Sequence, residues 1–426
     1  MAAASDKARF YLEQYVPELQ EYQQKGIFTR EEITAITSKR SGFEHTLNAR
    51  GSTPADYARY ATYEMNLDSL RKKRCKRLGI KGVKTFNGQR TVFFVLDRAT
   101  KKFPGDMGLW MQYIDFCRKE KASKKLAKVL TSVLRLHPRN SSLWILAAKH
   151  YAETQGDMGT ARSYFQRGLR FCKDEAKLYL EYARLEMVYL AKLKARKQLL
   201  GLDENREKKT QDEDDNMITL PIITAEDIDP NAEKGLEEVN EDVLKRLESA
   251  PAFSGAIPTA IFDAAMKQFT TSRNAASVAE SFYDLVATFE NVHAAPTVLQ
   301  HILSYLREQE ASSVERVICD AKHELYAVDT QSAEFPPSLT KLLAVIKKGL
   351  GDVTEKKQPL LAEKAALLLL TYTAASTAGE RELDADIAMV LAVSVKRYLR
   401  RYPISYIHRA DHRAALATYA LHPAGD

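Results

Sequence analysis

Bulky apolar residues recur along much of the chain at the spacing of one helical stripe. Trp110 and Trp144 lie 34 residues apart, and Tyr179 follows 35 residues later. Large side chains at i, i+3 and i+6 stay on one face of an α-helix. Four segments show this spacing: Tyr57-x-x-Tyr60-x-x-Tyr63-Glu64, Trp110-x-x-Tyr113-x-x-Phe116, Tyr179-x-x-Tyr182-x-x-Leu185-Glu186 and Tyr283-x-x-Val286-x-x-Phe289-Glu290. The common period predicts a helical repeat.

A second amphipathic segment accompanies each stripe and supplies the surface against which it packs. The segments that begin at Val92 and Val129 end at Phe103-Pro104 and His137-Pro138, where proline stops a helix. Ala161-Arg162-x-x-Phe165-x-Arg167-Gly168-Leu169 follows the Trp144 helix in the same way. A single helix pair cannot bury its own apolar face, so neighbouring pairs must stack. The pattern predicts an all-α fold, a right-handed α-solenoid.

Aromatic residues on such stripes are expected to form the core of the repeats and to take no direct part in function. Aromatic side chains at helical spacing pack between helices far more often than they line a ligand site. We expect this structural role for Tyr57, Tyr60, Tyr63, Trp110, Tyr113, Trp144, Phe165, Tyr179 and Tyr182.

The pattern divides the chain into four segments. Residues 1–53 are predicted to form an N-terminal helical cap of two or three helices, with a capping box at Thr29-Arg30-Glu31-Glu32 opening the second. Repeats are expected over residues 54–200. Residues 201–256 carry few aromatics and are predicted to be an acidic, partly disordered insertion. Helical repeats resume over residues 257–426, beginning with a partner for the Tyr179 helix.

Composition agrees with this division. Glycine (18) and proline (14) are scarce in the 426 residues, which argues against an all-β fold with its many turns. The formal charge is +7, but residues 65–130 hold 18 Lys/Arg and 5 Asp/Glu, whereas residues 201–249 hold 6 and 16. A basic segment next to an acidic one suggests a surface for polyanions and an acidic loop, although both could be solvated faces only.

The most basic stretch runs from Arg71 to Arg77, where six of seven residues are cationic. Such a cluster could neutralise RNA phosphates, serve as a nuclear import signal, or only solubilise a helix end. Backbone contact is expected because no aromatic-rich sheet for reading bases is visible. The candidate contacts are Arg71, Lys72, Lys73, Arg74, Lys76, Arg77, Lys81 and Lys84.

Chemistry of other kinds finds little support. No phosphate loop, dinucleotide fingerprint or nucleophile elbow occurs, so catalytic residues and cofactors are not expected. His408 and His412 share a helical face but have no evident third ligand, and the four cysteines are far apart, so no metal site is predicted. The charged residues Asp6, Lys7 and Arg9 argue against a secretory signal. No apolar run reaches the roughly 20 residues of a membrane span, so an intracellular protein is expected.

The repeat resembles the HAT (half-a-tetratricopeptide) repeat, which combines aromatic-x-x-Tyr-x-x-apolar-Glu with Ala-Arg-x-x-Phe-x-Arg-x-Leu. Cys117 and Tyr151 stand where this pattern has glutamate, and Ala147 stands where it has tyrosine. The N-terminal segments are similar to the HAT-repeat U-three small-nucleolar-RNA-associated protein family of the UTP-B subcomplex. The residues that carry this likeness are Tyr11-Leu12-Glu13, Val16-Pro17-Glu18-Leu19, Lys25-Gly26-Ile27-Phe28-Thr29, Lys39-Arg40-x-x-Phe43-Glu44 and Arg167-Gly168-Leu169-Arg170-Phe171.

The resemblance implies a nucleolar scaffold of the small-subunit processome that acts in early 18S ribosomal RNA maturation. It further implies WD-repeat propeller partners and contact with the 5′ external transcribed spacer and the U-three small nucleolar RNA. One alternative is a HAT-repeat scaffold of pre-mRNA splicing or 3′-end processing. Another is a cytosolic tetratricopeptide-type adaptor for peptides, which would need a groove lined by Lys and Asn, whereas the expected grooves are apolar and aromatic.

Overall fold

The computed structural model describes residues 2–80, 87–199, 255–270, 274–377 and 384–401. Helices joined by turns and short connections make up these residues, and no β-strand occurs among them, so the predicted all-α fold is confirmed. The chain divides into two units, Met1–Ala147 and Ala148–Asp426. The predicted insertion, Lys81, Lys84, His408 and His412 lie outside the described residues, apart from the last two positions of the insertion.

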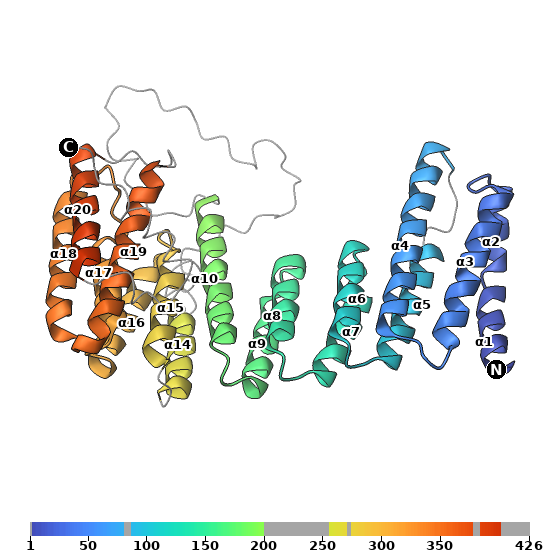
Figure 1. The fold of residues 1–426 in the computed structure, drawn as a ribbon, viewed down its shortest axis with the longest axis horizontal. Coiled ribbons are helices and arrows are strands. Elements are labelled where there is room, and N and C mark those ends of the chain that lie inside the picture. The colour runs from blue at the N-terminus through green and yellow to red at the C-terminus, as the bar shows by residue number, and fades with distance from the viewer. Residues whose placement is uncertain (1, 81–86, 200–254, 271–273, 378–383, 402–426) are drawn as a thin grey trace, which may run out of the picture. The chain divides into compact units, whose positions relative to one another are not determined.

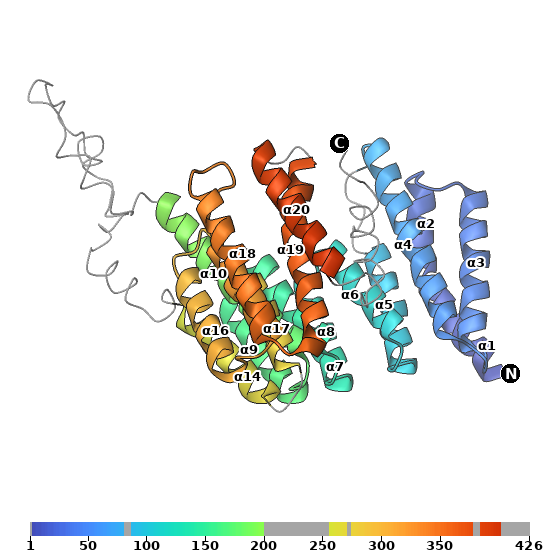
Figure 2. The ribbon, with the colours of Figure 1, turned by 60° about the vertical axis from the view of Figure 1, so that its left-hand side comes forward.

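The first unit is a row of helices whose axes lie side by side (Figures 1 and 2). In chain order they are α1 (Ala2–Glu13), α2 (Val16–Gln24), α3 (Arg30–Asn48), α4 (Pro54–Arg77), α5 (Asn87–Lys102), α6 (Met107–Lys119), α7 (Ser123–Leu136) and the larger part of α8 (Ser141–His150). As expected, α5 and α7 end directly before Phe103-Pro104 and His137-Pro138.

The second unit begins with the end of α8 and contains the remaining helices (Figure 1). They are the π-helical turn η1 (Tyr151–Gln155), α9 (Met158–Phe171), α10 (Ala176–Leu199), α14 (Ala256–Phe269), α15 (Ala275–Ala287), α16 (Ala295–Gln309), α17 (Val314–Glu324), α18 (Phe335–Asp352), the 3₁₀ turn η2 (Glu355–Lys357), α19 (Gln358–Thr377) and α20 (Ala385–Arg401). The Tyr179 helix packs on the segment after the insertion, because the Tyr179 and Phe269 rings lie 5.9 Å apart.

Two local predictions need correction. The capping box at Thr29 forms, with the Glu32 amide donating to the Thr29 hydroxyl, but it opens the third helix. The cause is Pro17, which has no amide N–H to continue α1 and so begins a separate α2. The Tyr283 helix is also shorter than its stripe predicts. The amide of Phe289 donates to the carbonyl of Val286, a turn bond that replaces α-helical bonding after Ala287.

The two tryptophans secure equivalent turns between successive helices. The indole Nε1 of Trp110 donates to the carbonyl of Pro104 at 2.8 Å, and Trp144 donates to Pro138 at the same distance. Each bond joins an aromatic of one helix to the proline that ended the helix before it. The 34-residue period therefore repeats a hydrogen bond as well as an apolar stripe.

A constellation of four buried or half-buried side chains occurs twice, in α3–α4 and in α9–α10. Arg40 donates from Nε and Nη2 to both carboxylate oxygens of Glu64 at 2.8 Å, while the Phe43 and Tyr60 rings stack at 4.9 Å. In the second copy, Arg162 donates in the same manner to Glu186 at 2.7 Å, and Phe165 stacks on Tyr182 at 5.0 Å. Helix α3 thus pairs with α4 as a repeat does.

The remaining core follows the predicted stripes. Tyr57, Tyr113 and Trp144 are buried, as are Trp110 and Tyr179, whereas Tyr63 is only half-buried. The last helices of the second unit enclose an apolar core of Leu, Ile, Val and Ala side chains, among them Leu342, Ile346, Leu369, Leu391 and Val395. Burial of this kind contributes on the order of 25 cal/mol per Å² of apolar surface and holds adjacent pairs together.

Candidate interaction surfaces

Among the described residues, no group of three or more His, Cys, Asp and Glu residues could hold a metal ion. No helix described is long and apolar enough to cross a bilayer. Burial raises the pKa of the Cys117 thiol to about 12, which keeps this thiol protonated and unreactive at neutral pH. Two surfaces, a basic patch and an apolar groove, are the candidate functional features of the described residues.

The basic run on α4 is divided by its surroundings, and half of it faces inward. Arg71 is buried and pairs with Asp68 at 2.6 Å. Lys72 bonds to Asp68 at 2.8 Å and, across to the α6–α7 turn, to Glu120 at 2.9 Å. The Arg71–Asp68 pair lies within α4, whereas the Lys72–Glu120 pair joins α4 to the turn after α6.

Arg74 also makes contacts that stabilise the fold. It forms two 2.7 Å bonds with the carboxylate of Glu32, and its guanidinium lies 4.9 Å from the ring centre of Phe28. The hydrogen bonds from Arg74 and from the Thr29 amide lower the pKa of Glu32 to about 2. Glu32, which completes the capping box of α3, therefore also anchors the end of α4 through Arg74.

The other half of the run is exposed. Lys73, Lys76 and Arg77 point into solvent and form no ion pair with any described residue. The Lys72–Glu120 bond brings the α6–α7 turn beside them, with the exposed cations Arg118, Lys119 and Lys121. We call this set of six residues the α4-end patch. Cations at helix C-termini also complement the helix dipole, so a stabilising role accompanies any binding.

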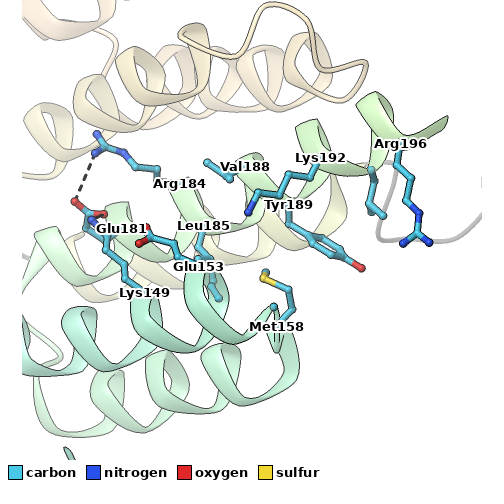
Figure 3. A pocket seen from close by; sticks show the side chains of 13 residues that line it. Lys149, Glu153, Met158, Glu181, Arg184, Leu185, Val188, Tyr189, Lys192 and Arg196 are labelled. Carbon is cyan, nitrogen blue, oxygen red and sulfur yellow. Dashed lines mark ion pairs between the residues drawn. The ribbon is translucent and has the colours of Figure 1, made fainter. Parts of the chain in front are cut away.

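A groove of about 450 Å³ lies on the second unit, between the end of α8 with η1 and the second half of α10 (Figure 3). Its lining is mostly apolar and comes from a stripe along α10 and from Met158 at the start of α9. The main apolar residues are Ala152, Met158, Leu185, Val188, Tyr189 and Leu193.

The groove arises because the helices that meet there differ in length. α10 has 24 residues and α9 has 14, or about 36 Å and 21 Å at 1.5 Å per residue. The Arg162–Glu186 pair joins the beginning of α9 to the middle of α10, so the last turns of α10 extend beyond the start of α9 (Figure 1). The apolar stripe of α10 therefore continues past the helix that would cover it.

The rim of the groove carries an excess of positive charge. Glu181 is neutralised by Lys149 at 2.7 Å and lies 3.6 Å from Arg184. Lys192 and Arg196 are exposed on the extending part of α10 and have no ion-pair partner among the described residues. A protein segment with apolar side chains and carboxylates would complement such a groove.

The sequence predicts the apolar stripe on α10 but not the groove, because the repeat pattern supplies a second helix for the whole stripe. A signal is present in the cations Lys192, Lys194 and Arg196, which continue the helix beyond its partner's length. The relative lengths of α9 and α10 are needed to interpret this signal.

Comparison with known proteins gives one consistent family. Residues 12–97 match the family model for U3 small nucleolar RNA-associated protein 6. The chain is 39% identical over 199 residues to the protein of that name from Schizosaccharomyces pombe, which covers 46% of this chain and 41% of the relative. It is 35% identical over 190 residues to the human homolog, covering 44% and 32%, and 25% identical over 347 residues to the Dictyostelium discoideum homolog, covering 79% and 55%.

These matches reach less than two thirds of the length of each relative. The stretch that matches the family model contains the buried Arg40–Glu64 pair and the basic run Arg71–Arg77. The family match therefore spans the segment in which the buried pair and the basic run of α4 lie.

Proposed function

We propose that this chain is a non-catalytic scaffold that associates with the U3 small nucleolar RNA machinery in ribosome biogenesis. The observation that carries the proposal is the similarity of residues 12–97, and of about 190–200 residues in two relatives, to proteins named for association with that RNA. The fold supports it, because stacked helix pairs offer long surfaces for partners.

In its finer form, the proposal assigns the chain to the UTP-B subcomplex of the small-subunit processome, in the nucleolus, in early 18S pre-ribosomal RNA processing. Its protein partners there are WD-repeat propeller subunits, and its RNA partners are the 5′ external transcribed spacer and the U3 small nucleolar RNA. The names of the matching proteins favour this assignment. The two copies of the Arg–Phe/Tyr–Glu constellation in α3–α4 and α9–α10 support a HAT-like repeat in general. A HAT-repeat scaffold of splicing or 3′-end processing is the competing assignment.

The two surfaces differ in the kind of partner that each binds. The α10 groove binds a protein segment through apolar contacts, which change little with salt. The α4-end patch attracts RNA phosphates, and binding there weakens steeply as salt rises because counterions are released. Lys73, Lys76 and Arg77 supply the exposed charge, while Arg71 and Arg74 are occupied within the fold.

A tagged pull-down at low and high salt tests the proposal, with bound proteins identified and bound RNA sequenced. WD-repeat processome subunits together with 5′ external spacer RNA are expected from the unaltered chain. Val188→Asp with Lys192→Glu should reduce protein recovery at both salts. The charge-matched control is Ala344→Asp with Lys348→Glu, at two exposed positions on α18. Recovery of spliceosomal or cleavage factors alone would refute the processome assignment.

A further inference from the structure

Nearly all exposed charged residues of the first unit between residues 88 and 140 are cationic. Ten Lys or Arg residues of this stretch are exposed, and Asp115 is its one exposed carboxylate. Three of the ten belong to the α4-end patch. The other seven are on α5 and α7 or in the turn after α7, and they are Arg90, Lys101, Lys102, Lys124, Lys128, Arg135 and Arg139.

A groove of about 400 Å³ runs between α5 and α7 within this surface. Lys101 of α5 lines one side, and Lys125 and Lys128 of α7 line the other. Trp110 forms part of its lining, and the bond between the His137 ring and the Pro104 carbonyl, at 2.8 Å, joins the two sides at one end.

The Asp97 carboxylate is the one that lines the groove, and its charge is already paired within the protein. Asp97 accepts from Lys125 at 2.7 Å and from the Tyr113 hydroxyl at 2.6 Å. Lys101 and Lys128 have no ion-pair partner among the described residues. The net charge presented by the groove is therefore positive, because the carboxylate that could oppose a bound anion is neutralised by its own lysine.

Three cations of α7 that have no ion-pair partner among the described residues lie on one face of the helix. At about 100° per residue, Lys124, Lys128 and Arg135 fall within a stripe about 40° wide. They extend along about 16 Å of the helix at 1.5 Å per residue. Lys128 lies at the edge of the groove, so Lys124 and Arg135 continue its rim in both directions. A row of this length faces several phosphates of an extended chain at once.

We propose that the α5–α7 surface binds the phosphate backbone of RNA, without reading the sequence. The inference rests on the proposed association with RNA and adds a site distinct from the α4-end patch. An acidic protein is a weaker fit because the lining of this groove is less apolar than that of the α10 groove and rows of cations border it. Base stacking is not part of the site, because the Trp110 indole is buried and bonded to Pro104.

Fluorescence anisotropy of the full chain with a labelled single-stranded 20-nucleotide RNA, across a salt series, tests this site. The variant is Lys101→Ala/Lys128→Ala/Arg135→Ala, and its control is Lys341→Ala/Lys347→Ala/Lys348→Ala, which removes equal charge from α18 of the second unit. A third variant, Lys73→Ala/Lys76→Ala/Arg77→Ala, reports on the α4-end patch. We expect the α5–α7 variant to bind about tenfold more weakly at low salt and its salt slope to fall by about 2.

The outcomes separate the inference from the proposal on which it rests. No RNA binding by the unaltered chain overturns both. Binding that only the α4-end variant weakens overturns the α5–α7 site and leaves the proposed RNA association standing. An equal loss in the α18 control means that only net charge matters, which also overturns the site. Poly-glutamate that displaces RNA at equal charge concentration would show an acidic-polymer surface instead, against the inference.

Discussion

Replacing Glu64 by glutamine should destabilise the first unit strongly. Arg40 and Glu64 are each only 1% exposed, and two 2.8 Å bonds join them. Glutamine keeps the size of the side chain but removes its charge, so the Arg40 guanidinium stays buried without a counterion. Glu44 cannot take over fully, because it already pairs with Arg98 at 2.9 Å. Loss of one partner of a buried pair costs about 3–5 kcal/mol.

The second copy of the same constellation provides a matched control. Glu186→Gln removes the same charge at the same helical position, but the Arg162 side chain is 29% exposed and can regain water. We expect a loss of about 1–2 kcal/mol there, between the buried and surface limits. The comparison isolates burial, since sequence spacing, bond geometry and ring stacking are alike in the two copies.

Hydrogen exchange of the full chain, resolved by peptide, measures the two losses separately. Amides of α3 and α4 should lose protection in the Glu64 variant, and amides of α9 and α10 in the Glu186 variant. Arg40→Met/Glu64→Met should recover most of the loss, because an apolar pair leaves no orphaned charge. The reasoning fails if Glu64→Gln costs no more than Glu186→Gln, or if the double variant is less stable than the single one.

Three further outcomes are expected. Gly349→Ala in α18 should lower the free energy of unfolding by about 1–3 kcal/mol, because the added Cβ would lie 2.3 Å from Val317 Cγ1. Thermal or urea unfolding measures this loss. The control Gly351→Ala, with open space around it, should be neutral or stabilising. Lowering the pH from about 4.5 to about 2 should loosen the end of α4 from the start of α3. The folded-state pKa of Glu32 is depressed to about 2, so its contribution is present above its unfolded pKa and is lost as the pH falls through the folded pKa. The pair is partly exposed, so the loss is small, and amide exchange at the end of α4 should rise on acidification in wild type but not in Glu32→Gln. Trp144→Phe should cost about 1 kcal/mol by removing the bond to Pro138, and equal stability of the two proteins would count against that bond.

The spacing of apolar residues predicted the fold well, because it follows from which side chains are buried between helices. The stripes at Trp110, Trp144 and Tyr179 lie on helices, and the prolines at 104 and 138 follow the ends of α5 and α7. Periodicity says less about where a helix ends inside a stripe. Phe289 continues the spacing of Tyr283 and Val286 but lies in a turn. Its apolar character is the same in both settings, so the sequence could not distinguish them.

The number of charged residues in a stretch of sequence predicts function less well than apolar spacing predicts fold. A count of charges does not show which of them form ion pairs within the protein. Six cations in seven residues suggested one continuous contact surface, yet Asp68, Glu120 and Glu32 engage Arg71, Lys72 and Arg74. Two of these acids lie far from the run in sequence and approach it only through helix stacking.

The same stacking leaves cations of α5 and α7 free outside the densest run, mostly within the basic segment 65–130. Lys101 and Lys128 are 27 positions apart in the chain and line one groove. The neutralising acid, Asp97, belongs to the same groove and is itself held by Lys125. Whether a lysine binds a partner molecule or the protein itself is thus decided by which carboxylates the helix packing brings within reach. Any RNA-binding surface on a helical array of this type should therefore be sought among cations whose neighbouring acids are already paired.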